Sequence, residues 1–169
     1  MVFLHHDWMS MTYPVWKLVH IVAVIAFLGN IATGLFWAIR AHKTRDLRFI
    51  ASTFDGIIRS DRWVTLPGVA GMVIAGVGAS IDARLPILST GWIFWSIVLL
   101  SISGVIFAFR VAPLQRSLLE LAVAGDNSAL AMTSLDRDFR HWERWGLIAL
   151  MAPLMALVLM VLKPSLAGL

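Results

Sequence analysis

Four long apolar runs dominate the hydrophobic pattern of the chain, and polar segments separate them. The runs cover residues 15–37, 63–81, 92–109 and 145–162. A helix needs about 20 mostly apolar residues to cross the hydrocarbon core of a bilayer, and each run is close to that length. Tryptophan lies at one or both ends of every run, where the membrane–water interface is expected. The pattern predicts an all-α integral membrane protein.

Helical periodicity continues beyond the apolar runs. Four apolar residues recur at helical spacing before the second run: Leu47, Ile50, Phe54 and Ile57. Residues 110–122 extend the third run in the same way, and residues 128–145 lead into the fourth. Pro67 and Pro113 predict kinks where these extensions join the membrane helices, and Pro153 predicts one inside the fourth. We therefore expect a single domain, residues 1–169, folded as a four-helix bundle with helical extensions.

Composition agrees with a membrane protein. The chain has 169 residues, of which 59% are hydrophobic and 14% charged, whereas soluble domains are about half apolar and a quarter charged. The absence of cysteine excludes disulfides, thiolate metal sites and cysteine nucleophiles. The formal charge of +4 does not indicate nucleic-acid binding, because the basic residues flank the apolar runs. The expected surroundings are a lipid bilayer.

The basic residues predict the orientation in the membrane. Six lie in residues 38–62 and five in residues 110–144, against only Lys17, Arg84 and Lys163 on the other side. Short connections rich in Lys and Arg stay in the cytoplasm. We therefore expect the helical extensions to be cytoplasmic and both termini to lie outside. The predicted location is a cytoplasmic (inner) membrane.

His20 is the main candidate for chemistry. It is the only histidine within the apolar runs, and Lys17 lies three residues before it on the same helix face. Ionisable residues inside a membrane are functional candidates, and neutral imidazole is a good ligand for haem iron. Alternatively, His20 is an interfacial side chain bonded to a backbone carbonyl. Lys17 is expected to extend its amine toward the outer interface.

The first two runs offer a surface that His20 could share. Asn30 should face protein, because an unpaired amide in lipid is costly. The second run carries a stripe of small residues, namely Gly68, Gly71, Ala75 and Ala79. Such a stripe lets another helix approach closely, and it can also leave room for a flat cofactor. A haem b held by His20 would lie against Gly71 and Ala75.

A second axial ligand must come from the outer half of the bundle. Met160 has a suitable depth in the fourth run, and His5 and His6 lie on the same side of the membrane. A five-coordinate haem and a ligand shared across a homodimer are the alternatives. His141 is expected on the opposite side, so one haem cannot use both His20 and His141.

The segment IIRSDRW (57–63) is a second polar cluster, at the cytoplasmic mouth of the second run. We expect Arg59, Asp61 and Arg62 to pair with the charged residues of 136–143 in a structural ion-pair network. Binding of lipid head groups or haem propionates is the alternative.

Four stretches carry a family resemblance: WKLVH (16–20), GNIATGLFWAIRAHK (29–43), IRSDRWVTLPG (58–68) and FRVAPLQRSL (109–118). Together they resemble a bacterial family of predicted integral membrane proteins of unknown function. The first run alone also resembles the HemJ-type protoporphyrinogen IX oxidases and the CopD-type membrane proteins. In the HemJ type, a first-span histidine in a K-x-x-H context is implicated in haem b binding, and Lys17 and His20 match that element.

Two functions follow as hypotheses. The first is a small haem b-binding or redox membrane protein with His20 as the ligand of the iron. The second is a non-enzymatic accessory or assembly subunit of a larger membrane complex, or a homodimer. Whether the protein is an enzyme is left open by the sequence.

Overall fold

The described residues form six α-helices and two short π-helical segments. The computed structural model describes the backbone of residues 4–126 and 128–168, and side chains from Thr12 onward. The helices are α1 (Leu4–Thr44), α2 (Leu47–Ser60), α3 (Leu66–Asp82), α4 (Gly91–Ile106), α5 (Ala112–Ala124) and α6 (Ala129–Leu162), with η1 (Asp61–Thr65) joining α2 to α3 and η2 (Phe107–Val111) joining α4 to α5.

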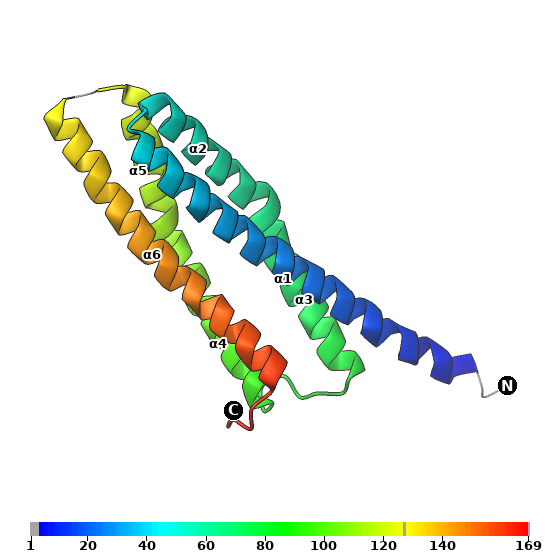
Figure 1. Ribbon diagram of the computed structural model, residues 1–169. Helices are drawn as coiled ribbons and strands as arrows, with labels where there is room; N and C mark the ends of the chain where they lie inside the picture. Colours follow the sequence, from blue (N-terminus) through cyan, green and yellow to red (C-terminus); the bar gives the residue numbers. More distant parts are fainter. Residues whose placement is uncertain (1–3, 127, 169) are drawn as a thin grey trace.

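These elements form four long rods: α1, α2–η1–α3, α4–η2–α5 and α6 (Figure 1). Each rod is long and apolar enough to cross a membrane. The prediction of four membrane helices that continue into extensions is therefore confirmed. The rods run alternately up and down and pack as an all-α bundle.

The two central rods change their helical winding instead of breaking at proline. The Leu66 N–H donates to the Asp61 carbonyl, and the Ala112 N–H donates to the Phe107 carbonyl, which are i→i−5 bonds. Pro67 and Pro113 then occupy the first turn of α3 and α5, where a missing N–H is tolerated. The sequence located both irregularities but did not predict their π-helical form.

The buried core lies at the α2–α5 end of the molecule. The amphipathic face predicted for residues 47–57 is buried here, and Phe54 packs edge-on against Trp142 with ring centroids 5.2 Å apart. Asp46 caps α2, because its side chain accepts from the backbone amides of Arg48 and Phe49. The largest fully buried side chains all belong to this core: Ile50, Phe54, Leu118 and Leu135.

Toward the other end, the rods separate into two pairs. α1 packs on α3, and α4 packs on α6, but no Cα atom of α3 lies within 8 Å of one in α4 or α6. Figure 1 shows α1 and α3 diverging from α4 and α6. We call this arrangement the fork. Lipid tails are as apolar as the helix surfaces, so apolar contact alone does not force the two pairs together in a membrane.

Hydrogen bonds from serines hold α4 against α6. The Ser103 hydroxyl donates to the Ala149 carbonyl at 2.7 Å, and the Ser96 hydroxyl lies 3.3 Å from the Ala156 carbonyl. Pro153 sits four residues after Ala149 inside α6 and has no N–H to offer that carbonyl. Ser103 thus supplies the donor that the proline removes.

Candidate functional site

His20 points from α1 into the neighbouring helix α3. Its Nδ1 lies 2.7 Å from the Met72 carbonyl oxygen, and because a carbonyl only accepts, Nδ1 carries the hydrogen. In the neutral ring, Nε2 then holds the free lone pair. The ring rests on Gly76, where an added Cβ would lie 3.1 Å from Cε1 and Nδ1. A bond to a backbone carbonyl is expected of a structural histidine, and it also leaves Nε2 available to a ligand, so it fits both interpretations of His20.

The small-residue stripe of α3 is used for helix packing. A Cβ on Gly68 would lie 3.6 Å from Cβ of Phe27, and one on Gly71 would lie 3.8 Å from Cβ of Ala23, so both glycines face α1. Ala75 is fully buried in the same half of the molecule. The space that the sequence offered to a flat cofactor beside Gly71 is therefore taken by α1.

The remaining predicted site residues are dispersed. Lys17 is exposed, whereas Asn30 is half-buried and bonds to residues of the α2–η1 region. Met160 is half-buried on α6, which belongs to the other pair of the fork, so the structure does not bring it to His20. The side chains of His5 and His6 lie outside the described residues. Among the side chains described, no group of three His, Asp or Glu could hold a metal ion.

The ion-pair network predicted between residues 57–63 and 136–143 is wrong. Arg59 pairs with Asp55 on its own helix, while Asp136 pairs with His42 and Arg45 of the α1 end. The cause is the antiparallel packing of the core, which places the start of α6 beside the end of α1. Among the described side chains, Asp61 therefore does not pair with the residues of 136–143.

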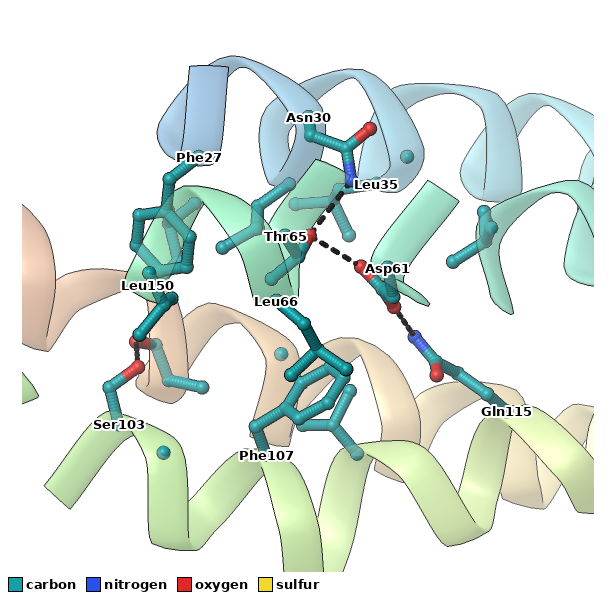
Figure 2. Close-up of a pocket in the computed structure, with 18 of the residues that line it drawn as sticks. Phe27, Asn30, Leu35, Asp61, Thr65, Leu66, Ser103, Phe107, Gln115 and Leu150 are labelled. Atoms are coloured by element: carbon teal, nitrogen blue, oxygen red, sulfur yellow. Dashed lines mark hydrogen bonds between the residues drawn. The ribbon is translucent and has the colours of Figure 1, made fainter. Parts of the chain in front are cut away.

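A cavity of about 330 Å³ lies where the two helix pairs diverge. Its walls come from every rod, and most of the lining is apolar, including Phe27, Leu66, Phe107 and Leu150 (Figure 2). Leu66 lines the cavity and is 59% exposed, so its side chain also faces the surroundings of the molecule. We call it the fork cavity.

A chain of hydrogen bonds crosses one wall of the fork cavity. The Asn30 amide donates to Thr65 Oγ1 at 2.9 Å, and the Thr65 hydroxyl donates to Asp61 Oδ1 at 2.9 Å. From the opposite side, the Gln115 amide donates to Asp61 Oδ2 at 3.0 Å. Figure 2 shows this polar chain running from α1 through η1 to α5. It ends on both sides at the Asp61 carboxyl.

Among the residues that the structure describes, Asp61 is the only charged one in the cavity lining. In the part of the chain that the structure describes, no Lys, Arg or His side chain pairs with it. Its two hydrogen-bond donors are neutral groups, and an ionised carboxylate has about four acceptor sites. The arrangement is a partly buried carboxyl with unused acceptor capacity, facing an apolar space.

The comparison with known families decides the classification. One family model matches residues 14–164, which is most of the chain. The chain belongs to the family described as "Predicted integral membrane protein (DUF2269)". This confirms the resemblance to a family of predicted membrane proteins. No curated protein and no solved structure matches the chain.

For this DUF2269 chain, sequence reasoning missed the importance of Asp61 and Gln115. Asp61 lies directly before the second apolar run, which is a visible signal, but the surrounding arginines favoured an ion-pair interpretation. Gln115 is 54 residues away and lies in an amphipathic segment with no distinguishing motif. Their meeting depends on how α2 packs on α5, which no local pattern encodes.

Proposed function

We propose that this protein binds an amphipathic molecule from the bilayer in the fork cavity. The observation that supports this is a mostly apolar cavity of about 330 Å³ whose lining includes the Asp61 carboxyl and the neutral donors that bond to it. Small-molecule sites have volumes of about 300–1,000 Å³ and combine an apolar lining with a few placed polar groups. Leu66, which lines the cavity and is exposed, marks the place where a ligand would enter directly from the membrane.

The membrane and orientation belong to the same proposal. The distribution of Lys and Arg favours the bacterial cytoplasmic membrane with the α2–α5 core on the cytoplasmic side. In that orientation Asp61 lies near the cytoplasmic boundary, and the fork opens toward the outer leaflet. The ligand's polar end would then be held near the inner surface of the membrane.

A photoreactive alkyl probe in lipid nanodiscs tests the proposal. Gly146 and Gly29 each have open space around an added Cβ, but only Gly146 lines the fork cavity. Gly146→Leu should fill the cavity and remove labelling of its walls, whereas Gly29→Leu, on an exposed face of α1, should not. Equal labelling of the cavity walls in both variants and the wild type would refute the proposal.

Haem b binding through His20 is a second candidate function. It is supported by the hydrogen bond from Nδ1 to Met72, because haem- and metal-ligating histidines commonly donate the other ring N–H to a carbonyl. A haem here would take one ligand from His20 and would need a five-coordinate iron or a ligand from elsewhere. The protein purified from membranes should then show a Soret band that His20→Ala removes and His141→Ala keeps. A colourless wild type, or an unchanged band in His20→Ala, counts against it.

An accessory or assembly role, or a homodimer, is the non-enzymatic alternative. It is motivated by exposed apolar side chains on α3 and α4, such as Ile74 and Ile102, which a partner helix could cover. Cross-linking in native membranes, followed by mass determination in mild detergent, should then give a stable complex. A monomer without partners in both experiments would contradict this role.

A further inference from the structure

Asp61 carries information about the ligand that an apolar cavity alone does not. Burying a carboxylate without a cation is costly, and neutral hydrogen bonds from Thr65 and Gln115 offset only part of that cost. For a purely apolar ligand, a neutral side chain at position 61 would avoid the cost of burying a carboxylate. The carboxyl instead remains at the cavity surface with acceptor sites to spare.

The donors around Asp61 are arranged so that the carboxyl stays the acceptor. Asn30 donates to Thr65, Thr65 donates to Asp61, and Gln115 donates from the other side. Thr65 and Gln115 are themselves buried, at 5% and 4% exposure, so their geometry is fixed by packing. This shell orients both carboxyl oxygens and supplies no positive charge.

We propose that the fork cavity selects an amphipathic amine, with its ammonium group at the Asp61 carboxylate and its apolar body along Phe27, Leu66 and Phe107. This inference rests on the proposed function, since it names the ligand class of the same cavity. Charge complementarity favours this occupant over an alcohol or an anionic amphiphile. The described part of the cavity lining holds no Lys, Arg or His that would receive an anion.

The size of the selectivity can be anticipated. An ammonium group donating to a carboxylate forms a charge-assisted hydrogen bond, which is worth roughly twice a neutral one. We expect the amine to bind about tenfold or more tightly than an alcohol with the same alkyl chain. An alkyl sulfate should bind more weakly than either, because its charge repels Asp61.

A matched series of n-decyl compounds tests the head-group preference. Decylamine, N-acetyldecylamine, decanol and decyl sulfate share one chain length and differ in charge. Each competes against the photoreactive alkyl probe in nanodiscs of zwitterionic lipid, with wild type, Asp61→Asn and Asp55→Asn. Asp55 is the control, because it lies on the neighbouring helix α2, pairs with Arg59 and does not line the cavity.

Support would be a tenfold amine preference in wild type and Asp55→Asn that disappears in Asp61→Asn. Equal competition by all four compounds in wild type, or an amine preference that survives in Asp61→Asn, overturns the inference while leaving the cavity as a binding site. Absence of cavity labelling by the probe itself overturns the proposed function, and the inference falls with it. If Asp61→Asn does not fold, the wild type still decides: stronger competition by decylamine than by N-acetyldecylamine supports the inference, and equal competition overturns it.

Discussion

Replacing Ser103 by alanine should destabilise the α4–α6 pair because it leaves the Ala149 carbonyl without a donor. Pro153 occupies the position whose N–H would normally bond that carbonyl. Ser103 is 6% exposed and Ala149 is 8% exposed, so little of either residue is open to the surroundings of the molecule. In membranes, side chains such as serine are known to satisfy backbone groups freed by proline.

The expected loss follows from two limits. An unsatisfied buried acceptor costs about 1–3 kcal/mol, whereas interhelical hydrogen bonds in a membrane average only about 0.6 kcal/mol in double-mutant cycles. Because Pro153 has no N–H to offer this carbonyl, we expect Ser103→Ala to cost about 1.5 kcal/mol. Ser101→Ala is the control, since the exposed Ser101 bonds only to the Ile97 carbonyl of its own helix.

Pro153→Ala supplies the test of the cause. In that background residue 153 regains an N–H that can bond the Ala149 carbonyl, so Ser103→Ala should cost only about 0.5 kcal/mol. The expected coupling is therefore about 1 kcal/mol, and any change in the shape of α6 cancels between the two arms of the cycle. Reversible unfolding in mixed micelles, followed by circular dichroism, gives all four free energies. An equal cost in both backgrounds, or a cost no larger than that of Ser101→Ala, would refute the reasoning.

Three further predictions concern packing and capping. Gly78→Ala should lower the unfolding free energy relative to the control Gly29→Ala by about 1–3 kcal/mol, because its Cβ would lie 2.7 Å from the Trp16 ring; equal stability would contradict this. Phe54→Ala should cost about 3–5 kcal/mol in the same unfolding assay, since Phe54 is fully buried. A cost below about 1 kcal/mol would contradict the burial of Phe54 in the core. The pKa of Asp126 is lowered by the backbone N–H and hydroxyl of Ser128, so this turn should loosen as the pH falls below about 4; the Ser128 amide resonance should then shift with pH in wild type but not in Asp126→Asn.

The membrane spans and their extensions could be predicted from sequence because both depend on local periodicity. The spacing of Leu47, Ile50, Phe54 and Ile57 specifies one apolar stripe on a helix, and the structure buries that stripe. The side of α1 that carries His20 and Asn30 was also predicted to face protein, and both residues bond to the second rod. These features need no knowledge of which helices are neighbours.

The fork could not be predicted, because apolar membrane helices do not encode their partners in hydrophobicity. Small residues and hydrogen bonds decide the pairing instead, as at Gly76 beneath His20 and at Ser103 beside Ala149. The same limitation hid the meeting of Asp61 and Gln115. A sequence pattern shows that each is polar, but the distance between them is set by the packing of α2 on α5.

Both π-helical segments lie at the fork cavity. Each segment lies midway along a central rod, and each contributes to the cavity lining at both of its ends: Asp61 and Thr65 from η1, and Phe107 and Val111 from η2. A π turn widens the helix by one residue and changes the direction in which the following side chains point. The core packing below the segments and the separate pairs above them can therefore coexist in continuous rods. π turns recur at functional sites, so the presence of two of them at one cavity agrees with the proposal that the fork cavity binds a ligand.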